Sequence, residues 1–165
     1  MPPDYISVYI LYHNSFILYI IKKYVILYQI NSKGDRMKKF SSLPVGEAIT
    51  TVNKTNCAAA VKSGSLEVFA TPMMLALMEE ATCNTVAPLL ENDETTVGTK
   101  VTVTHDKASG IGTVITATAS LNEVDGRRLV FEVSATDDKG DTVGRGTIER
   151  FLVYSEKFMN RVNGK

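Results

Sequence analysis

Residues 71–90 read TPMMLALMEEATCNTVAPLL, and this stretch decides the fold. Thr71 and Pro72 open it, since threonine is a favoured N-cap and proline is favoured at the first helical position, where its missing N–H leaves no bond unmade. The pattern predicts a helix from Thr71 to about Leu90. Apolar residues occupy most of its circumference, which indicates a helix enclosed by other elements, as when a sheet wraps around it.

Two stripes run along this helix when its residues are placed at about 100° intervals. Glu79 falls on the apolar stripe and Glu80 on the polar one. The apolar stripe also holds Leu75, Cys83, Val86 and Leu90, and the polar stripe also holds Asn84 and Glu91. An unpaired carboxylate among apolar neighbours is costly. Glu79 is therefore either a carboxylate paired at the helix margin or a functional group, and its position alone does not separate the two.

Segments rich in Val and Thr lie on both sides of the helix. A connecting stretch, residues 57–69, separates the first of them from the helix. The predicted strands are Val45–Thr55, Thr96–Asp106, Gly110–Val124, Arg128–Thr136 and Asp141–Tyr154. The turn sequences between the last four are hairpin signals, which predict an antiparallel meander. The order predicts an α+β domain in which a long central helix packs on a curved antiparallel sheet of about five strands.

The first 36 residues differ in composition from the rest: they hold six of the 7 Tyr, and they contain no Ala, Glu, Thr or Cys. Lys22 and Lys23 interrupt the apolar runs and argue against a membrane span. The basic pair follows the apolar run and no small-residue cleavage site is evident, so a secretory signal also fits poorly. We interpret residues 1–36 as a leader outside the fold, from an upstream region, with Met37 as the start and residues 37–165 as one domain. A real interfacial helix or anchor is the alternative.

Composition excludes several classes of protein. The 165 residues carry 18 Lys plus Arg and 18 Asp plus Glu, so the formal net charge is zero. This balance argues against a nucleic-acid partner. Two cysteines and two histidines, His13 and His105, argue against a disulfide scaffold and a metal site. Residues 37–165 also show no membrane span and no nucleotide-binding glycine motif.

Short motifs in this order resemble the fluoroacetyl-CoA thioesterase-like branch of the hot-dog fold thioesterase superfamily. The resemblance covers nearly all of residues 45–154. It is carried by Phe69-Ala70-Thr71-Pro72, Leu77-Met78-Glu79-Glu80-Ala81, Thr96-Val97-Gly98-Thr99, Val103-Thr104-His105, Gly126–Val133 and Val143-Gly144-Arg145-Gly146. It implies the hot-dog fold and the hydrolysis of an acyl thioester.

The resemblance also implies a set of site residues. Thr71, Glu79 and His105 match the three residues that act together on the thioester in this branch, and Gly98 matches a glycine that contacts the substrate. An arginine associated with the coenzyme A side matches Arg150, although a slip of one residue would put Glu149 there.

Other residues are judged by their position. Phe69, Met73 and Met74 surround the start of the helix and are candidates to line an acyl pocket. His105 is predicted to share an inward strand face with Val97, Val101 and Val103, in the same interior as Glu79. Cys83 is interpreted as a small core residue rather than a nucleophile.

Helix geometry adds one constraint. Thr71 and Glu79 are eight residues apart, which is about 12 Å along one helix. They cannot easily touch within one chain. The resemblance to hot-dog thioesterases implies a dimer in which the helix start of one subunit faces the carboxylate of the other, so we expect a site across the interface of a homodimer or higher homo-oligomer.

These features predict a cytoplasmic acyl-CoA thioesterase that hydrolyses a short or small acyl-CoA and needs no cofactor beyond the coenzyme A of its substrate. Glu79 would act as nucleophile or as base on water. The alternative is a non-catalytic hot-dog module that binds acyl-CoA. A hydratase on the same fold is a third reading, which Asp106 disfavours because it lies on the opposite strand face from His105.

Overall fold

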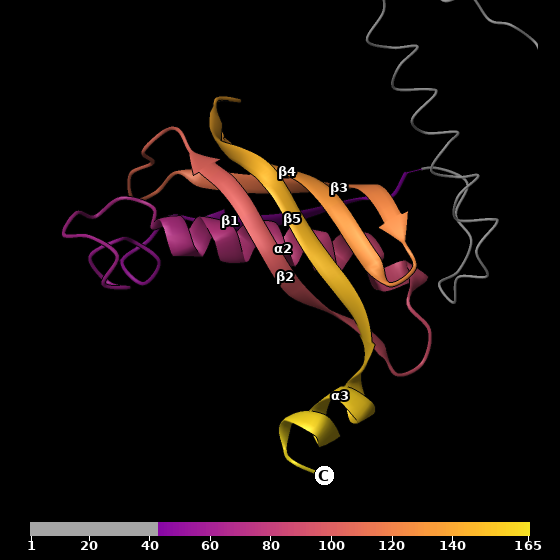
Figure 1. The fold of residues 1–165 in the computed structure, drawn as a ribbon. Coiled ribbons are helices and arrows are strands. Elements are labelled where there is room, and N and C mark those ends of the chain that lie inside the picture. Colours follow the sequence, from indigo (N-terminus) through magenta and orange to yellow (C-terminus); the bar gives the residue numbers. More distant parts are fainter. Residues whose placement is uncertain (1–42) are drawn as a thin grey trace, which may run out of the picture.

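Five antiparallel strands form one twisted sheet, and the long helix lies across one face of it (Figure 1). The computed structural model describes residues 43–165. The elements are β1 (Val45–Thr51), α2 (Thr71–Val86), the 3₁₀-helix η1 (Ala87–Leu89), β2 (Glu94–His105), β3 (Val114–Asp125), β4 (Arg128–Asp137), β5 (Thr142–Tyr154) and α3 (Ser155–Val162). The predicted helix-on-sheet architecture is confirmed. The predictions for residues 1–36 and for Met37 lie outside the described residues.

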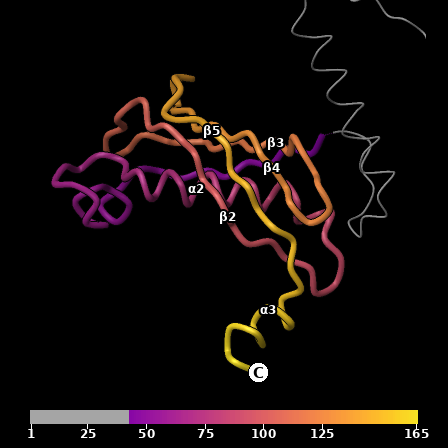
Figure 2. Tube along the Cα trace, in the orientation of Figure 1, coloured from indigo at the N-terminus to yellow at the C-terminus, as the bar shows by residue number. Residues whose placement is uncertain are grey.

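The strand order is β1-β3-β4-β5-β2, so the prediction of a four-strand meander is wrong. Only β3, β4 and β5 form consecutive hairpins, whereas β2 pairs with β5 at the far edge of the sheet (Figure 2). Gly146 in β5 leaves room for this pairing, because a Cβ there would collide with the Thr102 carbonyl of β2. The segment between β2 and β3 is thus a crossing connection and not a hairpin.

Several element ends differ from the prediction: β2 begins at Glu94 rather than Thr96, and β3 begins at Val114 rather than Gly110. The first strand stops at Thr51 because Asn56 closes a turn: its side-chain oxygen accepts from the Asn53 N–H at 2.7 Å, and its amide donates to the Thr51 carbonyl at 3.0 Å. The α-helix ends at Val86 rather than Leu90. Its last residues tighten into η1, which contains Pro88.

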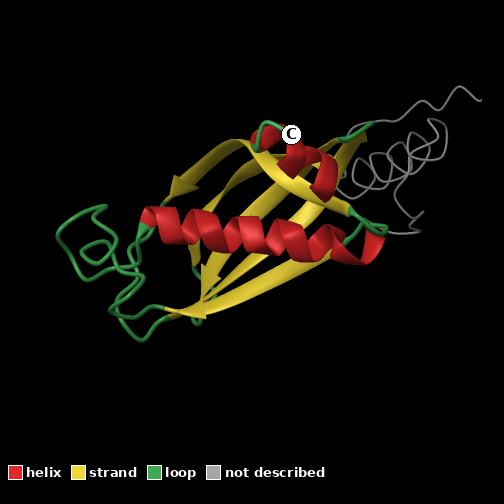
Figure 3. Ribbon diagram, turned by 90° about the horizontal axis from the view of Figure 1, so that it is seen from below, coloured by secondary structure: helices red, strands yellow, loops and turns green. Residues whose placement is uncertain are grey.

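The core lies between α2 and the concave face of the sheet. The buried side of the helix consists of Met74, Leu77, Met78, Ala81, Thr82, Thr85 and Val86. The predicted apolar stripe differs, because Leu75, Glu79 and Cys83 are only half-buried. The sheet covers one side of the helix and leaves the rest of its circumference open, as Figure 3 shows. Glu80 is exposed, as predicted.

A second helix, α3, follows β5 directly, and the sequence did not predict it. It is short and none of its residues is buried, although it carries Phe158, Met159 and Val162. None of the helices in residues 43–165 is long and apolar enough to cross a membrane.

An ion-pair cluster fixes the segment that follows β2. The Lys107 ammonium lies 2.6 Å from Asp137 Oδ2 and 2.6 Å from Asp141 Oδ2, at the β4–β5 turn. The Lys107 ammonium holds the pKa of Asp137 below its ordinary value, and the two carboxylates raise the pKa of Lys107. The chain just after His105 is therefore tied to the neighbouring turn.

This cluster predicts a pH-dependent loss of stability in Asp137→Asn. A lowered carboxyl pKa contributes stability above the ordinary value of 3.8, and that stability is lost as the pH falls through the lowered pKa. The raised pKa of Lys107 contributes stability below 10.5, and it is lost as the pH rises through the raised pKa. At pH 7 the unfolding temperature of Asp137→Asn should be lower than that of wild type. The gap should close as the pH falls below 3.8 and through the lowered pKa of Asp137.

The exposed neighbour Asp138 supplies the control, and Asp138→Asn should have the same unfolding temperature as wild type. A gap between Asp137→Asn and wild type that stays constant from pH 2 to pH 7 would contradict this assignment.

Candidate active site

The start of α2 meets the end of β2 through one side-chain hydrogen bond. Thr71 Oγ1 and His105 Nδ1 are 2.8 Å apart, although 34 residues separate them in the chain. His105 faces the helix because it pairs with Gly144 of β5, where a Cβ would press against Met74. The structure thus brings together two of the three predicted catalytic residues.

Thr71 is not the N-cap of the helix, contrary to the prediction. Ala70 occupies that position, Thr71 is the first helical residue, and no side chain caps this end. The Thr71 hydroxyl bonds His105 instead. Pro72 has no N–H, and the Met73 N–H donates to the Ala70 carbonyl at 3.0 Å. The polar groups that remain at the helix start are therefore the N–H and the hydroxyl of Thr71.

His105 retains an unused hydrogen-bonding nitrogen. Its Nε2 is enclosed and has no hydrogen-bond partner within residues 43–165. A buried polar atom without a partner is costly and marks either a functional group or a missing partner. The ring is held at Nδ1 by Thr71 and offers Nε2 to a further group.

Glu79 lies in a second group of residues, halfway along α2. The Arg150 Nη1 donates to Glu79 Oε1 at 3.3 Å. Arg150 is almost fully buried, and its other donors reach the hydroxyl of Thr96 at 2.9 Å and the Thr96 carbonyl at 3.0 Å. The Glu79 side chain is 41% exposed. The arginine therefore holds one carboxylate oxygen from below, on the sheet side, while the carboxylate stays open to solvent.

Gly98 lies against the same carboxylate. A Cβ at this position would be 2.5 Å from Glu79 Oε1, closer than real Cβ atoms approach a neighbour. The residue is a glycine because the carboxylate occupies the space of its missing side chain. The sequence motif marked Gly98, but it gave no sign that Thr96 would hold Arg150.

The register of β2 against β5 decides between Arg150 and Glu149. Gly98 pairs with Arg150, and both face the helix. Glu149 faces the other way, where Lys100 and Arg128 lower its pKa. Arg150 is thus the residue on the helix side.

A register shift between Gly98 and Lys100 corrects another prediction. The extra residue, Thr99, changes the face of every residue before it. Val97 pairs with Phe151 on the outer side, and only Val101 and Val103 share the inward face with His105.

The chain therefore presents two groups of functional side chains. Thr71 and His105 form one, and Glu79, Gly98 and Arg150 form the other. His105 bonds Thr71, and Glu79 bonds Arg150, so the two groups make separate contacts within the described residues.

An open cavity of about 470 Å³ borders Thr71 and His105. Phe69 contributes to its lining but is 2% exposed, because its ring packs into the core. Residues 63–66 and 106–108 supply much of the remaining wall. Residues 43–165 contain no cluster of three or more His, Cys, Asp or Glu that could hold a metal ion.

Comparison with known proteins identifies the family. The family model for the fluoroacetyl-CoA-specific thioesterase matches residues 52–156. This chain belongs to that family. A fluoroacetyl-CoA thioesterase of Streptantibioticus cattleyicolor is 46% identical over 99 residues, which are 60% of this chain and 70% of the relative. The family is one of thioester hydrolases.

Solved structures agree with the sequence match. A fluoroacetyl-CoA thioesterase structure superposes with a TM-score of 0.71 at 35% identity, over 78% of this chain and 98% of the other. A hot-dog-like protein from Thermanaerovibrio acidaminovorans, 23% identical, superposes with a TM-score of 0.67 over 74% of this chain and 90% of its own. The predicted hot-dog fold is confirmed.

Gly98→Ala tests the geometry around Glu79. The added methyl group would push the carboxylate away from Arg150, and the flexible glutamate side chain can yield without unfolding the domain. Thioester hydrolysis should fall at least about tenfold, since displacement of a catalytic group by about 1 Å can cost 10²-fold. Circular dichroism and the unfolding temperature should stay close to wild type.

Gly110→Ala is the matched control, because a Cβ there meets nothing within 4 Å. If Gly98→Ala hydrolysed thioesters as fast as Gly110→Ala, the observed position of the Glu79 carboxylate would not matter for activity.

Proposed function

We propose that the chain hydrolyses a short acyl-CoA thioester to the free acid and coenzyme A. One observation carries the proposal: the Thr71 hydroxyl does not cap the helix and is instead hydrogen-bonded to the His105 ring. Membership of a thioesterase family supports it. The reaction needs a donor for the thioester carbonyl, a group that activates water or attacks the carbonyl, and a proton for the leaving thiolate.

Thr71 would bind the thioester carbonyl. Its hydroxyl and N–H lie at the positive end of the α2 dipole, which stabilises the negative charge that develops on the oxygen. His105 orients the hydroxyl through Nδ1. Its Nε2 would exchange a proton with the leaving thiolate or with the attacking water, in keeping with the absence of a partner for that atom within residues 43–165.

Glu79 would either activate the attacking water or attack the carbonyl carbon itself. Arg150 binds Oε1, which fixes the orientation of the carboxylate and leaves Oε2 to act. As a base, Oε2 takes a proton from water while the hydroxide adds to the carbonyl carbon, and the C–S bond then breaks. As a nucleophile, Oε2 adds to the carbonyl carbon, the C–S bond breaks to release the thiolate and leave a mixed anhydride, and water later cleaves the anhydride. The cofactor-free chemistry that we expect is compatible with either route.

The complete site would form between two subunits. The helix geometry separates Thr71 from Glu79 by about 12 Å, which is too far for both to act on one carbonyl. The strand β2 lies at the edge of the sheet, and its inward residue Val101 is 40% exposed. The half-buried stripe of Leu75, Glu79 and Cys83 adjoins this open face. A two-fold homodimer that covers it would bring the Thr71 of one copy to the Glu79 of the other.

The reaction would take place in the cytoplasm. Both cysteines in the described chain, Cys57 and Cys83, are free thiols, as is usual for proteins of that compartment.

Glu79→Gln should abolish thiol release from acetyl-CoA, because the amide can neither accept the proton nor attack. Loss of a group that acts in the chemical step lowers kcat by about 10²-fold or more. The dimer should persist in size-exclusion chromatography. Glu80→Gln, one residue along on the exposed face, should stay near wild type.

Equal activity loss in Glu79→Gln and Glu80→Gln would refute the assignment. Wild-type protein that binds acyl-CoA and releases no thiol would support the non-catalytic binding module instead.

Mixed dimers test the position of the site. Thr71→Ala and Glu79→Gln subunits can be co-expressed with different tags, and the heterodimer purified through both tags. Across a two-fold interface both defects fall in one site, so the heterodimer keeps one intact site and about half of wild-type activity. Each mutant homodimer should be inactive. A heterodimer as inactive as the two homodimers would place the whole site within one chain.

A further inference from the structure

Thr96 holds the Arg150 guanidinium at two points. Its hydroxyl accepts from the Arg150 Nε–H at 2.9 Å, and its backbone carbonyl accepts from Nη2 at 3.0 Å. Both residues are buried. A guanidinium is planar, and its N–H groups are fixed relative to one another. Two bonds to one residue therefore set the direction of the third bond, which runs from Nη1 to the Glu79 carboxylate.

The buried Nε–H of Arg150 depends on the Thr96 hydroxyl. Within residues 43–165, Thr96 Oγ1 is the one acceptor that this N–H reaches. A buried donor without an acceptor is costly, most of all when it belongs to a charged group. Without the hydroxyl, the guanidinium would turn toward another acceptor. Because the group is rigid, Nη1 would then leave the Glu79 carboxylate.

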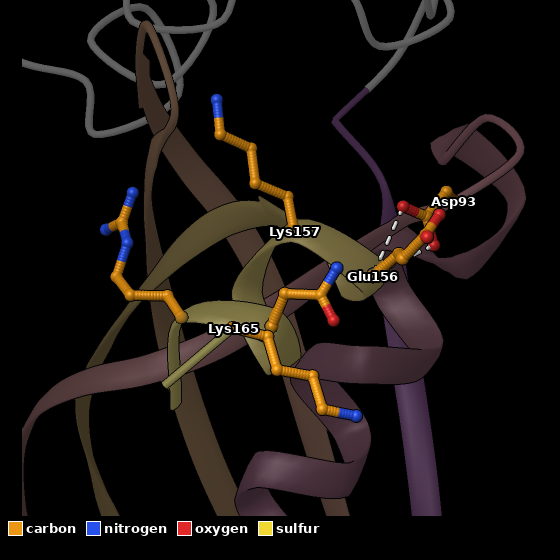
Figure 4. A pocket seen from close by; sticks show the side chains of 6 residues that line it. Asp93, Glu156, Lys157 and Lys165 are labelled. Atoms are coloured by element: carbon orange, nitrogen blue, oxygen red, sulfur yellow. Dashed lines mark hydrogen bonds between the residues drawn. The ribbon is translucent and has the colours of Figure 1, made fainter. Parts of the chain in front are cut away.

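The beginning of β2, which carries Thr96, is tied to the end of β5. Asp93 directly precedes β2, and its carboxylate accepts from the Glu156 N–H at 3.3 Å. Its backbone carbonyl accepts from the Ser155 N–H at 2.9 Å. Figure 4 shows Asp93 beside Glu156 at the first turn of α3, the helix that directly follows β5. These bonds fix the position of Thr96 relative to β5.

Thr96 is separated from the reacting group by the arginine. The guanidinium bonds Thr96 on one side and the Glu79 carboxylate on the other. The Glu79 side chain is partly open to solvent, whereas Thr96 is buried. Thr96 can therefore influence the attack on a thioester only through the position of the carboxylate.

We propose that Thr96 is a positioning residue for thioester hydrolysis, whose hydroxyl orients Glu79 through Arg150. The proposal rests on the function proposed above, in which Glu79 Oε2 acts on water or on the carbonyl carbon. A displacement of a reacting group by about 1 Å can cost about 10²-fold in rate. Because Thr96 does not touch the substrate, loss of its hydroxyl lowers kcat and leaves KM unchanged.

Two variants separate the hydroxyl of Thr96 from its packing. Thr96→Val keeps the shape of the side chain and removes the acceptor oxygen, whereas Thr96→Ser keeps the oxygen. With acetyl-CoA as substrate, kcat of Thr96→Val should fall at least about tenfold, with KM within about twofold of wild type. Thr96→Ser should recover kcat to within about threefold of wild type. Thr118→Val, on the outer face of β3, is the matched control and should keep the wild-type kcat.

A double-mutant cycle with Arg150→Met tests whether Thr96 acts through the arginine. Methionine has no N–H for the hydroxyl to bind, so Thr96→Val should change kcat by less than about twofold in this background. Circular dichroism checks that each variant is folded. The proposal is overturned if Thr96→Val lowers kcat by the same factor in both backgrounds. It is also overturned if Thr96→Ser loses as much activity as Thr96→Val, or if Thr96→Val is as active as Thr118→Val.

Crystal structures of the variants separate this proposal from the proposed function. In Thr96→Val, Arg150 Nη1 and Glu79 Oε1 should lie beyond hydrogen-bond distance, and in Thr96→Ser they should stay near 3.3 Å. If wild type releases no thiol while the carboxylate is displaced in Thr96→Val, the proposed function fails and the positioning of Glu79 by Thr96 stands. A carboxylate that keeps its bond to Arg150 in Thr96→Val defeats the positioning role alone.

Discussion

The pairing of β2 with β5 is the constraint on which the rest of the molecule depends. It joins strands that are separated in the chain by two others, and it succeeds because Gly146 removes the side chain that would block the approach. Once this register is set, His105 meets Thr71 at one end of α2 and Gly98 meets Glu79 at its middle. The bulge at Thr99 turns Gly98 and Arg150 toward the helix and Val97 and Phe151 away from it. The register of one strand pair thus decides which residues of β2 and β5 face the helix.

The ion pair of Glu79 and Arg150 shows how the fold accommodates a buried guanidinium. A buried guanidinium is costly unless its donors are satisfied, and Thr96 satisfies two of them with its hydroxyl and carbonyl. A third donor binds a carboxylate that is partly exposed. The arginine is therefore fixed by the strand, and the glutamate is oriented while it stays accessible to water. Thr71 is likewise oriented by a neighbour: its hydroxyl bonds His105, and no side chain caps the start of its helix.

Most of the fold follows from local sequence patterns. The helix of residues 71–86 and four of the five strands appear within a few residues of their predicted positions, because apolar periodicity, proline and turn glycines act locally. The errors arise where distant segments interact. The meander failed because strand order depends on packing across the sheet, and Val97 was placed on the wrong face because one bulged residue reverses the alternation. Helix α3 was not predicted because an amphipathic helix of only 8 residues directly after a strand gives a weak signal.

Local patterns in the sequence were enough to predict the central helix, because capping and apolar spacing act between near neighbours. The resemblance of short motifs to a known family marked Thr71, Glu79, His105, Gly98 and Arg150 as candidates. Which candidates are in contact depends on the tertiary structure. The Thr71 hydroxyl bonds the His105 ring, the Glu79 carboxylate bonds Arg150, and Arg150 rather than Glu149 lies on the helix side of β5. Those choices depend on strand register, and a shift of one residue in register exchanges the two faces of a strand.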